Sequence, residues 1–151
     1  MRIKITLNKP KDRIIELVNF AAKDLGSTNG LEIHIKNSKR CFRGRGGYRR
    51  NGIVKMAKTS RYCATACIGP DQFFPMDYQD CILKNWEDAL IWVAAHELFH
   101  CIQFRENLSH GEKAAVLYAT EILKEWQTPR QITEDRGRDD TCNHESRNPF
   151  K

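Results

Sequence analysis

Alternation of apolar and polar residues marks two segments of the chain as strands. Residues 2–7, RIKITL, and residues 31–36, LEIHIK, each place an aliphatic side chain at every second position. A period of two is typical of a strand that is buried on one face only. The segments GIVKMAK, from Gly52, and YCATACI, from Tyr62, are short and apolar, and they are predicted to form two further strands.

Helical spacing of apolar residues predicts three helices. Residues 10–26, PKDRIIELVNFAAKDLG, repeat apolar positions every three or four residues, with a proline at the start and a glycine at the end. Proline is favoured in the first turn of a helix and glycine just beyond the last. The second helix is predicted over residues 85–104 and the third over residues 112–126. Residues 69–80, GPDQFFPMDYQD, are typical of a turn-rich connection.

The order of these elements, a strand, a helix, several strands and then two consecutive helices, predicts an α+β domain. A chain of 151 residues is long enough for one hydrophobic core. We therefore expect one domain over residues 1–127. Residues 128–151 are polar and poor in aliphatic side chains, and they are predicted to form a mobile tail.

The composition, 40% hydrophobic and 29% charged, is typical of a soluble globular protein. Residues 1–13 lack the apolar segment of a signal peptide, and the longest apolar run, residues 89–95, is too short to span a membrane. A cytoplasmic location without membrane attachment is therefore expected, with the six cysteines as thiols or metal ligands. The formal charge of +6 indicates an acidic partner without identifying it.

The predicted second helix contains the segment HELFH, in which His96 and His100 lie four residues apart and Glu97 follows the first histidine. Residues four apart share one face of a helix, so both imidazoles can bind one Zn²⁺ ion. Glu97 lies about 100° round the helix from His96, where it can accept a proton from a water at the metal. The alternative is a helix that carries these residues by chance. The other residues of this helix are strongly apolar, so the helix is expected to be buried. Polar groups are costly to bury without strong partners, and this cost favours the metal site.

This HExxH segment resembles the active-site helix of the zincin metallopeptidases, and the resemblance extends from about Gly52 to Gln127. The resemblance implies a zincin-like domain, with helices packed on a small mixed sheet and a ligand-bearing helix after the active-site helix. It also implies a zinc-dependent enzyme that hydrolyses peptide bonds, with a protein or peptide as substrate. An extended peptide would then add to an edge strand, most simply GIVKMAK or YCATACI.

Two branches of that group are similar to the segment after the motif. The pair His110-Gly111 is similar to the SprT-like (Spartan-type) proteases, whose members act on DNA-bound proteins. Glu112 with Ala115, followed by an aromatic-alanine pair, is similar to the ligand helix of minimal gluzincins and ImmA-type peptidases. The first resemblance implies His110 as the third zinc ligand, and the second implies Glu112.

The third ligand is therefore open at the level of sequence. Glu112 is ranked first, His110 second and Glu121 third, with Glu106 as a further candidate. Glu112 and Glu121 lie about 180° apart on one helix, so they cannot both face the metal. Tyr118 could donate a hydrogen bond to a developing oxyanion, but an aromatic residue at this place is more often part of the core.

The segment from Lys36 to Arg50 combines seven Lys or Arg with three glycines and is predicted to be a flexible hairpin loop. Its cations alternate with Phe42 and Tyr48, a mixture that is typical of contacts to single-stranded nucleic acid. It is equally typical of a solvated basic loop. A non-catalytic nucleic-acid-binding module with structural zinc is thus the rival hypothesis, although a structural site has no use for Glu97 beside an open position.

Overall fold

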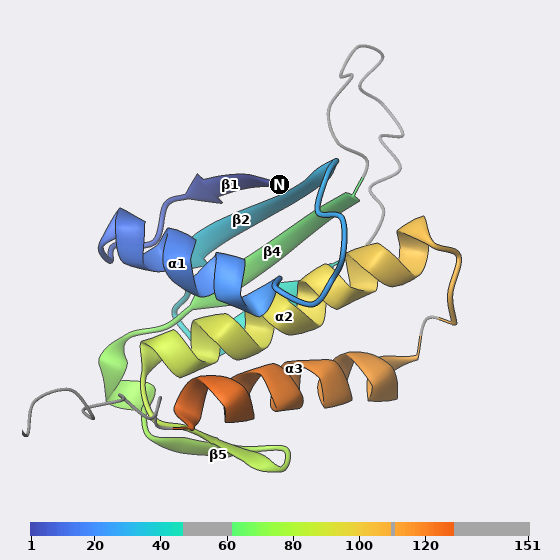
Figure 1. Ribbon diagram of the computed structural model, residues 1–151. Helices are drawn as coiled ribbons and strands as arrows, with labels where there is room; N and C mark the ends of the chain where they lie inside the picture. Colours follow the sequence, from blue (N-terminus) through green and yellow to red (C-terminus); the bar gives the residue numbers. More distant parts are fainter. Residues whose placement is uncertain (47–61, 110, 129–151) are drawn as a thin grey trace, which may run out of the picture.

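The computed structural model describes residues 1–46, 62–109 and 111–128, and these residues form an α+β domain (Figure 1). Three α-helices accompany a four-stranded mixed sheet and a separate two-stranded hairpin. In chain order the elements are β1 (Arg2–Ile5), α1 (Lys11–Ala21), β2 (Leu31–Asn37), β3 (Phe42–Arg45), β4 (Tyr62–Ile68), η1 (Asp71–Phe73), β5 (Met76–Tyr78), β6 (Cys81–Leu83), α2 (Trp86–Arg105) and α3 (Glu112–Gln127).

The large sheet has the strand order β1-β2-β4-β3. β1, β2 and β4 run parallel, and β3 pairs with β4 in the antiparallel direction. Ile33 of β2 lies between Ile3 of β1 and Ala64 of β4, so the alternating aliphatic residues share one face. The strands predicted in residues 2–7, 31–36 and 62–68 are confirmed, whereas the predicted strand GIVKMAK lies outside the described residues.

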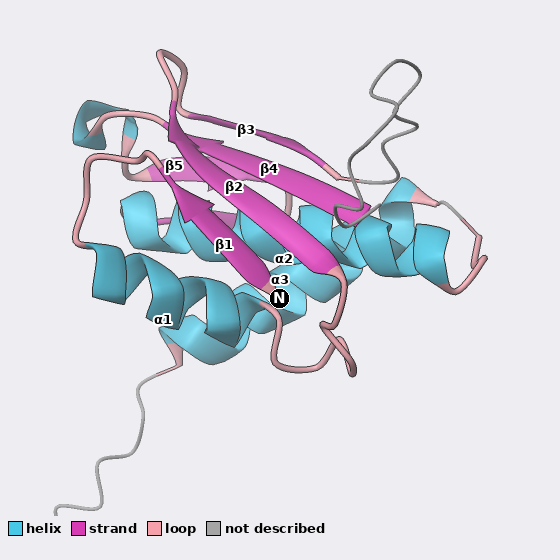
Figure 2. Cartoon of the chain, turned by 90° about the horizontal axis from the view of Figure 1, so that it is seen from above, coloured by secondary structure: helices cyan, strands magenta, loops and turns pink. Residues whose placement is uncertain are grey.

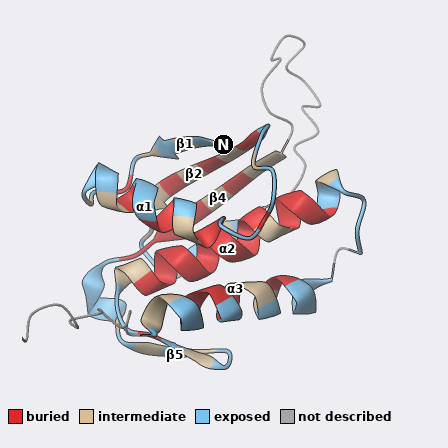
Figure 3. Cartoon of the chain, in the orientation of Figure 1, coloured by how far each residue is buried: buried red, intermediate tan, exposed pale blue. Residues whose placement is uncertain are grey.

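All three helices lie on one face of this sheet, as the view from above shows (Figure 2). α2 runs through the middle, with the sheet on one side and α3 on the other (Figure 1). This position explains why α2 is apolar around its whole circumference, since a helix enclosed on all sides buries all its faces (Figure 3). Its buried side chains join those of β2 and α1 in one core, which includes Leu90, Ile33 and Leu17.

α2 begins where the sequence predicts it. The side chain of Asn85 accepts hydrogen bonds from the backbone N–H groups of Glu87 and Asp88, at 2.9 and 3.1 Å. Such a cap stabilises a helix by about 1 kcal/mol. The Asp88 carboxylate in turn accepts from Gln127 Nε2 at 2.7 Å, which attaches the first turn of α2 to the last turn of α3. The predicted third helix is confirmed as α3, and the predicted first helix ends earlier than expected, at Ala21.

The prediction that Lys36 to Arg50 forms a hairpin loop is wrong for its described part. Lys36 belongs to β2, and Phe42–Arg45 form the edge strand β3, in which Arg43 pairs with Cys67 of β4. Phe42 packs edge-on against Tyr78, with 4.7 Å between the ring centroids. Phe42 is partly buried and packs against the core, so its ring faces away from the outer surface of the sheet. The period of two was not recognisable in the sequence, because glycines rather than apolar residues occupy the next two inward positions after Phe42. Tyr48 and Arg50 lie outside the described residues.

Two further predictions are corrected by the sheet topology. YCATACI is β4, an interior strand between β2 and β3, so it offers no free edge to a substrate. The predicted turn-rich connection instead contains β5 and continues into β6, an antiparallel hairpin in which Asp77 pairs with Ile82. Three-residue strands are too short to show a period of two, and a turn at Gln79, with φ of 53°, connects them.

The five described cysteines are free thiols, as expected. Among the described helices, none combines the length and apolar character that a membrane crossing needs. The predicted tail lies outside the described residues except for Thr128.

Candidate metal centre

Three predicted site residues converge between α2 and α3. His96 and His100 lie one turn apart on α2, and Glu112 lies in the first turn of α3. The Nε2 atom of His96 is 3.2 Å from Glu112 Oε2, and the Nε2 atom of His100 is 3.4 Å from Glu112 Oε1. One ligand atom from each of the three residues lies within 4.8 Å of the others, so the group could hold a metal ion.

The spacing of these atoms suits a tetrahedral ion. Bonds of about 2.0–2.1 Å to a tetrahedral metal place neighbouring ligand atoms about 3.3–3.4 Å apart. The two contacts between imidazole and carboxylate, 3.2 and 3.4 Å, have this length. The two histidines are only 9% and 8% exposed, so their orientation is fixed by packing rather than by solvent. Glu112 is open to solvent, with a side-chain exposure of 75%.

The hydrogen bonds of Gln103 determine the tautomer of His100. They therefore decide whether the ring nitrogen that faces the Glu112 carboxylate is a donor or an acceptor. Gln103 Nε2 donates to the backbone oxygen of Gly111 at 3.2 Å, so its Oε1 faces His100 Nδ1 at 2.7 Å. This arrangement assigns the proton to Nδ1 and leaves a lone pair on Nε2. In a neutral imidazole this lone pair faces a carboxylate oxygen, and a proton or a metal ion between the two atoms makes the contact favourable.

His96 is held by its neighbours in a similar way. Its ring stacks on Trp92, one turn earlier on α2, with 5.0 Å between centroids and 14° between planes. Its Nδ1 lies 3.1 Å from Glu97 Oε1, which leaves Nε2 to face Glu112. Trp92 Nε1 also donates to Thr120 of α3 at 3.3 Å. Both imidazoles therefore present Nε2 to the same point, with Nδ1 occupied by a protein group, as is typical of metal-binding histidines.

The edge strand β3 passes directly over Glu97. A Cβ atom added to Gly44 would lie 2.2 Å from Glu97 Oε1, and one added to Gly46 would lie 2.1 Å from the backbone oxygen of Glu97. A side chain at Gly44 would displace the Glu97 side chain, and one at Gly46 would require the strand or the helix backbone to move. Glu97 is consequently enclosed, with 7% exposure, between its own helix and a strand that approaches through its backbone alone.

The other candidate ligands that the structure describes, Glu106 and Glu121, do not join this group. Glu106 ends α2 and bonds to Arg105, and Glu121 is exposed further along α3. His110 lies outside the described residues. The prediction that Tyr118 belongs to the core is confirmed, because its ring stacks on Phe99 and its hydroxyl donates to the backbone oxygen of Ala21 at 3.0 Å. Burial raises the pKa of this phenol.

Sequence reasoning missed Trp92, Gln103, Gly44 and Gly46. Trp92 precedes His96 by four residues and Gln103 follows His100 by three, so helical geometry alone places each beside its histidine. Gly44 lies in β3 and Gly46 directly follows the strand, two residues on, and glycine inside a strand is a signal of close backbone approach. Both signals were present in the sequence, but the glycine signal could be recognised only after β3 had been identified as a strand.

No family model, curated protein or solved structure matches this chain. The site is therefore interpreted from its own geometry. Two oriented, buried imidazoles and a carboxylate define a candidate metal centre, and a fourth group, Glu97, lies beside it.

Proposed function

We propose that the protein is a zinc-dependent metallopeptidase with a zincin-like fold. The observation that carries this proposal is the convergence of His96, His100 and Glu112, whose ligand atoms lie within 4.8 Å of one another, with the carboxylate of Glu97 enclosed beside them. Two imidazoles and one carboxylate are a ligand set that suits Zn²⁺. The same set with a neighbouring carboxylate that is not a ligand is typical of catalytic rather than structural zinc.

The chemistry follows from the roles of these groups. When bound, Zn²⁺ polarises a peptide carbonyl and lowers the pKa of a water. Glu97 accepts the proton of the attacking water and delivers it to the leaving amine nitrogen. The close packing of Gly44 on Glu97 excludes solvent from one side of the carboxylate and limits its rotamers.

The sheet topology supports β3 as the strand to which a substrate adds. Among the described residues β3 is an edge strand, so one row of its backbone N–H and C=O groups has no partner strand there. It lies against α2 beside Glu97, whereas the other edge strand, β1, is separated from β3 by two strands. An extended peptide that pairs with β3 would pass next to the metal ligands. This assignment replaces YCATACI, which is an interior strand.

The rival hypothesis, a nucleic-acid-binding module with structural zinc, has less support from the geometry. Structural zinc sites are closed by four protein ligands. Within the described part of the chain three ligands converge, and the third has a side-chain exposure of 75%. Such a site leaves room for water and substrate.

Zinc content and peptide cleavage test the proposal together. The purified protein should contain about one Zn²⁺ per chain, and His100→Ala should lose it, because a ligand imidazole is removed. Zinc-loaded protein should cleave an unstructured fluorogenic peptide mixture, chelation should stop the cleavage and added Zn²⁺ should restore it. Absence of bound zinc after reconstitution at neutral pH contradicts the proposal. A zinc-loaded protein without cleavage supports the structural-zinc rival instead.

Replacement of Gln103 should weaken zinc binding although Gln103 does not touch the metal. Gln103→Leu removes the acceptor for His100 Nδ1–H, so we expect about a 10–100-fold loss of zinc affinity, the usual effect of losing a group that orients a ligand. Competition with a chromophoric chelator measures the affinity, and histidine nitrogen NMR of the metal-free protein reports the tautomer. Gln103→Glu keeps the acceptor for Nδ1–H but loses the donor to Gly111, so it should bind zinc more tightly than Gln103→Leu and more weakly than wild type. An unchanged affinity in Gln103→Leu would exclude a positioning role.

A further inference from the structure

The net positive charge of the described protein is confined to the four-stranded sheet and its turns. Residues 1–6, 31–46 and 62–68 contain seven Lys or Arg and one Glu, a balance of +6. The other described residues contain eight Lys or Arg and thirteen Asp or Glu, a balance of −5. Charge is therefore segregated between the sheet and the helical layer, although the sequence as a whole is only moderately basic.

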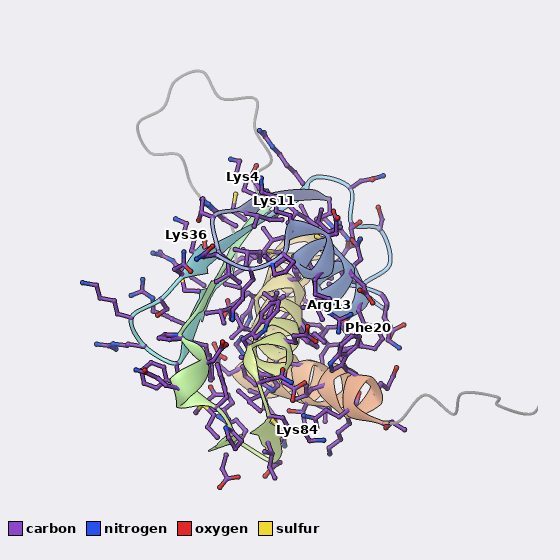
Figure 4. The ribbon with its side chains drawn as sticks, turned by 90° about the vertical axis from the view of Figure 1, so that its left-hand side faces the viewer. Lys4, Lys11, Arg13, Phe20, Lys36 and Lys84 are labelled. Carbon is purple, nitrogen blue, oxygen red and sulfur yellow. The ribbon has the colours of Figure 1, made fainter. Side chains whose placement is uncertain are left out.

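These cations lie on the face of the sheet that the helices leave uncovered. The inward positions of β1, β2 and β4 are aliphatic or alanine, whereas Arg2, Lys4 and Lys36 take the alternate positions and point outward. Arg43 and Arg45 do the same on β3. Figure 4 shows Lys4 and Lys36 on the sheet side of the molecule and Lys84 at its opposite end.

The register places cations on both sides of a line of small residues. Cys67 of β4 lies between Lys36 of β2 and Arg43 of β3, and Thr65 lies between His34 and Arg45. Adjacent strands are about 4.8 Å apart, so Lys36 and Arg43 flank β4 at about 10 Å from each other. The outer face of β4 is thus a shallow trough with basic walls.

One end of the trough is hollowed into an open pocket. It has a volume of about 250 Å³, and its lining is mainly polar and basic: Asn37, Ser38, Lys39, Arg40, Arg43 and Cys67. Ion pairs within the described ranges use Arg2 and Lys4, both with Glu32, and leave Lys36, Lys39, Arg40, Arg43 and Arg45 without a carboxylate partner. The trough therefore keeps its positive charge available to a ligand.

We propose that this trough, formed by the outer faces of β2, β4 and β3 with the adjoining pocket, binds the phosphodiester backbone of a single nucleic-acid strand. The width of the trough equals two strand spacings, which accommodates one nucleic-acid backbone. Five unpaired cations can neutralise successive phosphates, and such contacts do not read sequence. Because Phe42 faces the core, it is not available for base stacking, and the proposed binding rests on phosphate contacts.

The same observations argue against other acidic partners. Stable attachment to an anionic membrane combines basic residues with an inserted apolar group. The large exposed apolar side chains of the described residues all lie outside the four-stranded sheet: Ile15, Phe73, Ile82, Phe104, Leu108 and Leu117. A protein partner would need an apolar interface core, which the sheet face lacks. The trough also lies on the opposite side of the sheet from the metal centre, so its role is independent of peptide hydrolysis.

Fluorescence anisotropy with labelled oligothymidylate tests this surface in the full-length protein. Wild type should bind at low salt, with a steep linear fall of log K against log salt. Lys36→Gln/Arg43→Gln/Arg45→Gln should weaken binding at least about tenfold at low salt and reduce the slope by about 2, since each single-strand phosphate contact contributes about 0.7. The matched control Lys84→Gln/Lys113→Gln/Lys124→Gln removes the same charge from the helical layer and should bind as wild type does. Thermal melting checks that both variants are folded.

Three results would overturn the proposal. The first is equal weakening by the two triple variants, which would reduce the effect to net charge. The second is tighter binding to a duplex of the same length than to the single strand, which would exclude the trough as a single-strand site. The third is absence of oligothymidylate binding at low salt. This result overturns the proposal whether or not the protein binds vesicles of phosphatidylserine and phosphatidylcholine. Equal affinity for oligothymidylate and oligocytidylate is expected, because phosphate contacts do not distinguish bases.

Discussion

Glu97→Gln is expected to leave the fold and the bound zinc intact while reducing peptide hydrolysis by about 100- to 10,000-fold, the usual contribution of a general base. The amide has almost the same size as the carboxylate, so it fits below Gly44, where there is no space for additional atoms. It cannot accept the proton of the attacking water. Single-turnover cleavage of a fluorogenic peptide, with zinc content measured on the same sample, separates loss of chemistry from loss of metal.

Glu106→Gln is the matched control for this variant. Glu106 is the C-cap residue of the same helix and its carboxylate bonds to Arg105, far from the histidine pair in the described structure. This control should cleave the peptide at the wild-type rate. Cleavage by Glu97→Gln at that same rate would remove Glu97 from the reaction.

Glu112→Ala is expected to lower zinc affinity by at least about tenfold, because it removes the only described carboxylate within reach of both imidazoles. Glu121→Ala is the control, since Glu121 is an exposed carboxylate of the same helix outside the cluster. It should bind zinc as wild type does. Glu112 also lies in the first turn of α3, where a negative charge stabilises the helix by about 0.3–1 kcal/mol. Melting of the metal-free variants therefore has to accompany the titration.

His110→Ala distinguishes the two sequence resemblances. If Glu112 is the third ligand, His110→Ala should retain zinc and mainly reduce turnover. Loss of zinc in His110→Ala together with its retention in Glu112→Ala would instead assign the third ligand to the histidine-glycine pair of the SprT-like pattern. Zinc titration of His110→Ala and Glu112→Ala therefore distinguishes the two alternatives, because each predicts that a different variant loses the metal.

Much of the site could be predicted because its central geometry is local. An α-helix fixes the relative direction of His96, Glu97 and His100 from their spacing alone, whatever packs against them. The start of α2 was predictable for the same reason, since the Asn85 cap acts within three residues. The aliphatic alternation of β1 and β2 also identified which side chains are buried, because a strand has a period of two.

Prediction failed where a residue acts through partners distant in sequence. Phe42–Arg45 has the composition of a basic loop, and it becomes a strand because β4 supplies hydrogen bonds and Trp92 and Tyr78 enclose Phe42. The interior position of β4 was equally hidden, since the strand that covers its edge was not recognised. Backbone pairing between distant segments depends on the whole sheet rather than on the propensity of one segment.

The sequence by itself determined the secondary structure of the helices, the direction of the two imidazoles and the presence of a neighbouring carboxylate, because these follow from the repeat of one helix. Only the tertiary structure brought Glu112 to the two imidazoles and kept Glu106 and Glu121 outside the cluster, since these positions depend on how α3 packs on α2. It also placed Gly44 on Glu97 and Gln103 between His100 and Gly111. The concentration of positive charge on one sheet face also depends on tertiary structure. The strands that carry these cations are separated in sequence, and they become neighbours only when their aliphatic sides are buried against the helices.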